Sequence, residues 1–162
     1  MKIFRKFLWV LLLVFIAIQF FRPEKNISSG ASPNDISQKF SVAEDVKQIL
    51  TTSCYDCHSN NTRYPWYFSI QPVAWWLSSH IEEGKEHLNF DEFSSYRLRR
   101  QYKKLVEIKE MVEENEMPLA SYTLIHRDAI LSQEQKTTLA RWTENQVNRM
   151  KAEAPPDSLL KK

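Results

Sequence analysis

Glycine is nearly missing from this chain of 162 residues, which contains only two. Antiparallel sandwiches, glycine-rich phosphate loops and dinucleotide-binding turns need glycine at special backbone angles, so these classes are disfavoured. Cysteine is equally scarce, with two residues. The 43% of hydrophobic residues still suffice for a packed core. We therefore expect an all-α protein with one domain of ordinary size.

Net positive charge is confined to the N-terminus. The formal net charge is +2, but residues 26–162 hold 17 basic and 19 acidic side chains. Nucleic-acid binding needs clustered, net positive charge, so we expect no nucleic-acid partner.

The N-terminus has the pattern of a targeting segment. Basic residues at 2–6 precede fifteen residues, Phe7 to Phe21, that are apolar except for Gln19. No small-x-small cleavage site follows closely, which favours an uncleaved anchor over a removed signal peptide. As a helix the run spans roughly 22 Å, short of a hydrocarbon core of about 30 Å, and flanking basic side chains can close part of that gap by snorkelling. In either case the basic cap stays in the cytoplasm and the body is exported.

Composition divides the chain into four parts. Residues 1–21 are the expected signal-anchor or transmembrane segment, and residues 22–40, rich in serine, asparagine and proline, the expected flexible linker. Residues 41–150 form the expected folded domain. Residues 151–162 form a polar tail, because Pro155 and Pro156 cannot continue a helix.

About four helices are expected in the domain. The first covers about 41–53 behind a capping box of Ser41 and Glu44, and the second opens at Pro72 and continues to about residue 88. The third covers about 94–116, and the fourth starts at a capping box of Ser132 and Gln135. Apolar spacing assigns buried faces to the second and fourth helices: Val73, Trp76, Leu77, His80 and Ile81, and Leu139, Trp142 and Val147.

The motif at residues 54–58 has the spacing C-x-x-C-H of a c-type haem attachment site. Two thiols three residues apart on a helical turn point the same way and can form thioethers to the two vinyl groups on one porphyrin edge. The next residue brings its imidazole under the iron. We therefore predict one haem c, bound covalently through Cys54 and Cys57, with His58 as an axial ligand.

Three other uses of the cysteine pair carry less weight. A thioredoxin-like dithiol belongs at a strand-to-helix junction, and no strand pattern is evident. A structural zinc site needs four protein ligands, and the chain has two cysteines. A disulfide between them would close a loop too small to stabilise a domain much.

The sequence around the motif resembles a known family. The similar stretches are C-Y-D-C-H-S-N-N-T-R-Y-P-W-Y at 54–67, Q-P-V-A-W-W-L at 71–77 and M-P-L at 117–119, followed by Tyr122 and His126. Over roughly residues 42–142 the chain resembles the small bacterial haem-binding domain family of exported, usually anchored c-type proteins. The resemblance implies covalent monohaem binding with His58 as proximal ligand. With the N-terminal segment, it leads us to expect a single-pass protein of the bacterial inner membrane, facing the periplasm.

The sixth iron ligand is expected to be Met117. It lies 59 residues beyond His58 on a loop after a helix, as does the methionine ligand of the cytochromes c to which this architecture is similar. A rigid Met-Pro step positions the thioether, although a core-filling role is the alternative. His126 in the same loop is the main rival, and His80 and His87 are weaker ones.

Two further residues are candidate haem contacts. Arg63 has donors suited to a propionate, and a solvated arginine is the alternative. Trp66 lies in an aromatic-rich stretch that either walls the haem or fills the core.

Electron transfer between unidentified periplasmic or membrane redox partners is the leading predicted function, with the haem as cofactor. A redox or gas sensor with an open or labile sixth position is the alternative. An enzyme such as a peroxidase is not expected, because no distal acid–base constellation is evident. Basic residues crowd the start of the third helix, where they form either a docking patch for an acidic partner or a solvated face.

Overall fold

The computed structural model describes residues 2–159, in which all regular elements are helical. The α-helices are α1 (Lys2–Ile18), α2 (Glu44–Ser53), α3 (Tyr55–His58), α4 (Val73–His87), α5 (Leu98–Glu113), α6 (Ala120–Thr123), α7 (Gln133–Glu153) and α8 (Pro156–Leu159). Short 3-10 helices connect them: η1 (Ile36–Gln38), η2 (Trp66–Ser69), η3 (Phe90–Ser95) and η4 (Arg127–Ala129). The all-α prediction is confirmed, and α2, α4, α5 and α7 correspond to the four expected helices.

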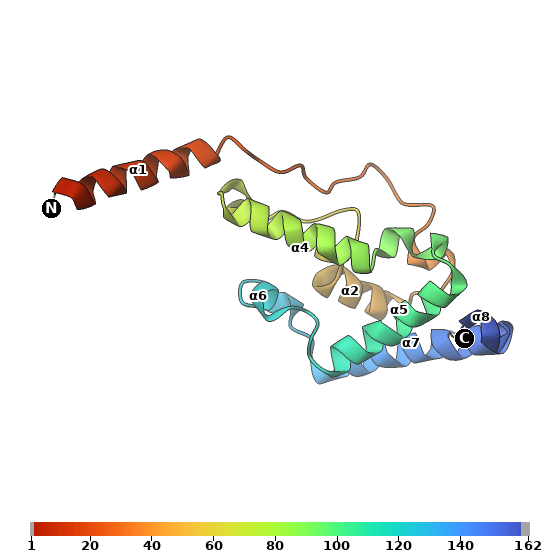
Figure 1. Cartoon of the computed structure of the whole chain (residues 1–162). Helices are drawn as coiled ribbons and strands as arrows, with labels where there is room; N and C mark the ends of the chain where they lie inside the picture. The colour runs from red at the N-terminus through yellow and green to blue at the C-terminus, as the bar shows by residue number, and fades with distance from the viewer. Residues whose placement is uncertain (1, 160–162) are drawn as a thin grey trace.

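The domain is built on an antiparallel pair of helices, α5 and α7 (Figure 1). Helix α2 packs on α7, and α8 packs on α5. Helix α3 lies between α2 and α4, so the C-x-x-C-H motif is held from both sides. Helix α1 projects away from this body (Figure 1).

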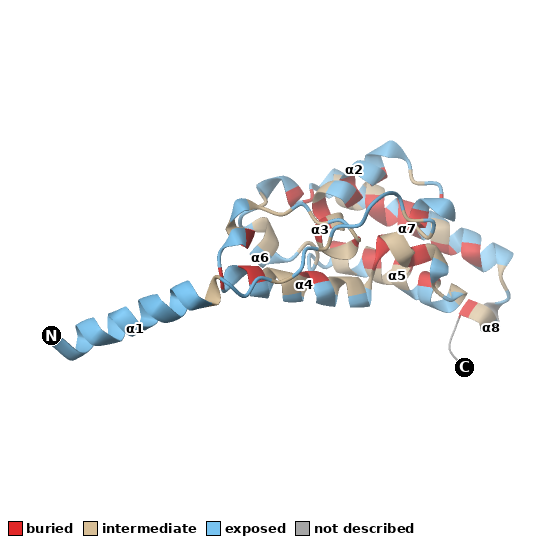
Figure 2. Cartoon of the chain, turned by 90° about the horizontal axis from the view of Figure 1, so that it is seen from above, coloured by how far each residue is buried: buried red, intermediate tan, exposed pale blue. Residues whose placement is uncertain are grey.

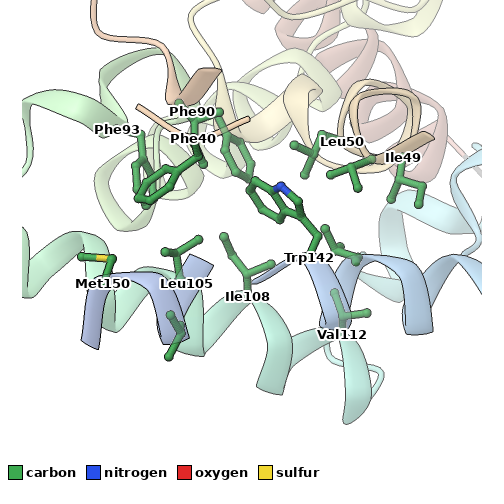
Figure 3. Packing of buried hydrophobic residues seen from close by; sticks show 14 of the residues in the cluster. Phe40, Ile49, Leu50, Phe90, Phe93, Leu105, Ile108, Val112, Trp142 and Met150 are labelled. Carbon is green, nitrogen blue, oxygen red and sulfur yellow. The ribbon is translucent and has the colours of Figure 1, made fainter. Parts of the chain in front are cut away.

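The core lies where η1, η3 and α2 cover the α5–α7 pair. Figure 3 shows the rings of Phe40, Phe90 and Phe93 and the indole of Trp142 above aliphatic side chains of α5. The rings of Phe40 and Phe93 meet edge to face at 5.9 Å, an arrangement that aromatic pairs prefer. The indole Nε1 donates to the Ser41 carbonyl oxygen at 2.9 Å. Cys54 packs against this cluster, so the core directly supports the motif.

Helix α1 has 17 residues and buries none of them (Figure 2). Within residues 2–159, no helix is both long and apolar enough to cross a membrane. The residues after α1 are tied to the domain, because Gln19 and the buried Gln71 exchange hydrogen bonds. Gln19 Nε2 donates to the Gln71 carbonyl oxygen at 3.2 Å, and the Gln71 N–H donates to Gln19 Oε1 at 2.9 Å.

Both segments expected to flank the domain contribute to its core. Ile36 and Phe40, from the predicted flexible linker at 22–40, are almost completely buried. Asn26 in the same segment donates from Nδ2 to the Ser59 carbonyl oxygen at 2.8 Å. From the predicted polar tail, Leu159 is buried in the core cluster. Apolar residues that are too far apart in the sequence to show helical periodicity are thus buried by packing against distant segments.

Three details of the helices differ from the prediction. The Ser41 capping box does not form, because α2 begins at Glu44 with Ala43 as its N-cap and no side chain caps this end of the helix. The α-helix predicted to start near 94 begins at Leu98, since 90–95 form η3. It ends at Glu113, before Asn115 takes a left-handed φ of 62°, a common way to end a helix. The Ser132–Gln135 capping box is confirmed.

The predicted buried face of α4 is wrong in part. Helix α4 buries Ala74 and Ile81, whereas Val73 and Trp76 are exposed. Part of the apolar stripe of α4, the helix that packs on the motif, is therefore not covered by the protein core.

Candidate functional site

Cys54 lies at the junction of α2 and α3, and Cys57 lies within the single turn of α3. The N–H of Cys54 donates to the Leu50 carbonyl oxygen at 2.9 Å, and the N–H of His58 donates to the Cys54 carbonyl oxygen at 3.0 Å. Burial, together with the nearby Cys57, raises the pKa of the Cys54 thiol to about 12. Burial, together with the negative charge of Asp56, raises the pKa of the Cys57 thiol to about 11. Both thiols are thus neutral at pH 7. A redox-active dithiol needs a lowered pKa, so this environment disfavours the thioredoxin-like alternative.

The imidazole of His58 is oriented by backbone carbonyls. Its Nδ1 lies 2.9 Å from the carbonyl oxygens of both Gly84 and Leu88. Carbonyl oxygens only accept, so Nδ1 carries the proton and Nε2 keeps its lone pair. Burial lowers the pKa of His58, which favours this neutral form. A histidine whose Nδ1–H is held by a carbonyl, with Nε2 free to bind, is the arrangement typical of a metal ligand.

Gly84 allows α4 to reach the motif. A Cβ at this position would lie 2.8 Å from the Cys57 carbonyl oxygen and 3.2 Å from the Cys57 Cβ. Glycine in a helix interior costs about 1 kcal/mol relative to alanine, and here that cost permits the contact between α3 and α4. The sequence contained a signal for this residue, a single glycine in mid-helix in a glycine-poor chain, but its role was not predicted.

Asp56, inside the motif, is the buried centre of a polar cluster that sequence reasoning missed. Its Oδ1 accepts from Arg63 Nε at 3.1 Å, and its Oδ2 accepts from the Tyr122 hydroxyl at 2.7 Å. Burial and the bond to Asp56 raise the pKa of Tyr122, so the hydroxyl stays protonated and donates. Arg63, predicted to meet a propionate, is therefore paired with a carboxylate, and its role toward haem stays a prediction.

The Tyr122 bond attaches the loop after α5 to the motif. In this loop the rings of Tyr122 and His126 stack at 4.4 Å. His126 Nε2 also lies 2.8 Å from the Tyr67 hydroxyl. The rival sixth ligand thus has protein partners on its face and on one ring nitrogen.

Met117 starts the same loop and is half-buried. Its N–H donates to the Met111 carbonyl oxygen at 3.1 Å, which holds the backbone close to the end of α5. The loop carrying Met117 is thus fixed at one end by α5 and further along by Tyr122 on Asp56.

The two weaker candidates for the sixth ligand, His80 and His87, both lie on α4. His80 Nδ1 donates to the Trp76 carbonyl oxygen at 2.9 Å, one turn earlier in α4. His87 is exposed in the last turn of α4.

Trp66 is 77% exposed and belongs to a larger set of apolar side chains without a protein cover. They lie between the motif and the first turn of α4, and between α5 and α7. The set comprises Ile70, Val73, Trp75, Trp76, Leu119, Leu124, Ile125 and Ile130. The two segments are joined by the contact between Tyr67 and His126, and exposed apolar side chains that gather in this way are typical of a binding surface. A large, flat, apolar group such as haem fits it.

Metal binding by side-chain clusters finds no other support. Among residues 2–159, no three His, Cys, Asp or Glu side chains are grouped so that they could hold an ion. A structural zinc site at the cysteines would need such a group.

The chain matches the model of a known protein family. Residues 13–145 match the model of a family described as a haem-binding domain. Neither the curated proteins nor the solved structures contain a match.

Proposed function

Because the chain belongs to the haem-binding domain family and binds haem, we propose that it carries one covalently attached c-type haem and transfers single electrons. The orientation of His58 is the observation that carries this proposal, since two carbonyls leave Nε2 as the only ring nitrogen able to bind iron. Haem bound in this way supplies a reversible one-electron change at its iron.

The side chains around the motif have distinct proposed roles. Cys54 and Cys57 provide sulfur atoms for two thioether bonds, and their burial keeps the thiols protonated until these bonds form. Gly84 and Leu88 hold the proton of His58 on Nδ1. Exposed apolar residues, Trp66 among them, exclude water from the faces of the bound group.

Met117 is the proposed sixth ligand. The Tyr122–Asp56 bond restrains its loop against the motif, and a fixed thioether favours a closed, six-coordinate iron suited to electron transfer. His126 is the less suitable donor, because its Nε2 meets Tyr67.

Replacement of Met117 tests both the ligand and the function. The oxidised protein should be low-spin and show the weak far-red sulfur-to-iron band, and Met117→Ala should abolish that band. Met111→Ala, in the same region, is the matched control and should keep it. If the wild-type protein is instead high-spin and binds carbon monoxide readily, the result would contradict electron transfer and favour the sensor function.

Attachment to the membrane through the N-terminal segment, with the domain in the periplasm, is part of the same proposal. It is supported by the basic residues in the first turns of α1 and by the exposed apolar side chains that follow them in the same helix. In bacterial cells the haem-staining band should sediment with membranes and resist alkaline carbonate. Release by carbonate, or recovery in the cytoplasmic fraction, would contradict this location.

A further inference from the structure

A basic groove lies between the end of α4, the start of α5 and α8. It is an open cavity of about 630 Å³, and one of its lining residues, Glu86, is acidic. Five lining residues are basic: Arg97, Arg99, Arg100, Lys103 and Lys104. The body of the protein is otherwise weakly acidic, so this groove is a local concentration of positive charge.

Much of this charge is not compensated by carboxylates. Arg100 donates from Nη2 to the Glu86 carbonyl oxygen at 2.9 Å, and Arg99 donates to the carbonyl oxygen of Asp157 at 3.3 Å. These bonds fix the guanidinium groups without neutralising them. Among residues 2–159, Glu107 is the carboxylate that pairs with the two lysines, at 3.1 Å from Lys103 Nζ and 2.6 Å from Lys104 Nζ.

The groove adjoins the peptide that holds the proximal histidine. His87 lines the groove, and the next residue, Leu88, accepts the Nδ1–H of His58 at 2.9 Å. Figure 1 shows α6 at the other end of the domain from α8, so a molecule in the groove does not compete with the Met117 loop.

We propose that this groove is the docking surface for an acidic face of a redox-partner protein. The inference rests on the proposed electron-transfer function, in which one electron leaves the ferrous iron and enters the oxidised partner. The cationic residues run from 97 to 104, roughly 10 Å along a helix. That spread matches several carboxylates on a protein surface rather than one small anion, and complementary charge accelerates association of this kind.

Two double variants with equal loss of charge test the groove. Arg99→Gln with Lys103→Gln removes two groove charges, and Arg141→Gln with Arg149→Gln removes two from the exposed side of α7. Each pair breaks one i,i+4 ion pair, Lys103–Glu107 or Arg149–Glu153. The measurement is stopped-flow oxidation of the reduced, full-length haem protein by ferricyanide and by cationic tris(phenanthroline)cobalt(III).

The groove variant should slow oxidation by ferricyanide roughly tenfold at low salt, and the α7 variant less than about twofold. The difference should disappear above about 0.5 M salt, and the cationic oxidant should not be slowed. Equal slowing of both variants would contradict docking at the groove, while the proposed electron-transfer function would remain. If neither oxidant reacts with the reduced wild-type protein, the proposed function itself fails.

Mapping with redox-inert hexacyanochromate(III) provides a readout independent of electron transfer. This paramagnetic anion should broaden the amide signals of residues 86–88 and 97–104 in the wild-type protein and lose that effect in the groove variant. Broadening elsewhere, or tight stoichiometric binding of inorganic phosphate in the groove, would overturn the assignment to an acidic protein.

Discussion

Replacing both motif cysteines, Cys54→Ser with Cys57→Ser, is expected to abolish covalent haem attachment completely. A serine hydroxyl does not add to a vinyl group under conditions in which a thiol does, so both thioether bonds are lost. Haem should then be removed by acid–acetone extraction, and the protein band on a denaturing gel should no longer stain for haem. Wild-type protein should keep its haem in both assays.

The single variants serve as matched controls for this experiment. Cys54→Ser and Cys57→Ser should each keep one thioether, and hence retain haem on extraction with a shifted pyridine haemochrome band. Circular dichroism of all three variants separates failed attachment from failed folding. Retention of haem by the double variant after extraction would disprove the covalent assignment, while haem binding as a property of the family would remain.

Gly84→Ala is expected to destabilise the protein, although glycine-to-alanine changes in helices usually stabilise. The ordinary gain is about 1 kcal/mol. Here the added methyl group meets the Cys57 carbonyl oxygen at 2.8 Å, a backbone atom that cannot rotate away. Separating α3 from α4 should cost more than the gain and lower the free energy of unfolding by on the order of 2 kcal/mol net. Urea unfolding of the haem-loaded protein, followed by circular dichroism, measures this change.

Glu83→Ala provides the control, because it lies on the exposed side of the same helix. It should change stability by less than about 0.5 kcal/mol. The Gly84 variant should also perturb the Soret spectrum, since the Gly84 carbonyl is a partner of His58. An equally stable Gly84→Ala protein with an unchanged spectrum would show that the close approach of α4 to the motif has no structural role.

Local signals predicted the helices well where side chains act within their own segment. The Ser132–Gln135 box starts α7 as expected, because both of its hydrogen bonds join residues three positions apart. The Ser41 box does not form, because α2 begins later than expected with Ala43 as its N-cap, and the Ser41 backbone is instead joined to a distant side chain, Trp142, through its carbonyl oxygen. The burial of Ile36 and Phe40 was also missed, because no local period marks residues that are buried by partners far along the chain.

The candidate site divides in a similar way. Cys54, Cys57 and His58 are close in sequence, so their spacing alone indicates haem attachment. Asp56 and Tyr122 are 66 positions apart, and only the folded chain brings them together. The uncovered apolar side chains of α4 read as core in the sequence, because helical periodicity shows that a face is buried and not what buries it.

The sequence by itself determined the chemistry of this protein: an all-helical chain with one C-x-x-C-H motif, too few cysteines for other uses, and a basic, apolar N-terminus. The tertiary structure decided how that chemistry is positioned. It determined which nitrogen of His58 is free, through carbonyls 26 and 30 residues away, and it placed the cations at the start of α5 beside the end of α4, next to the peptide that holds that histidine. The difference is physical, since spacing along one helical turn is a local property, whereas hydrogen bonds and charge between segments exist only after packing.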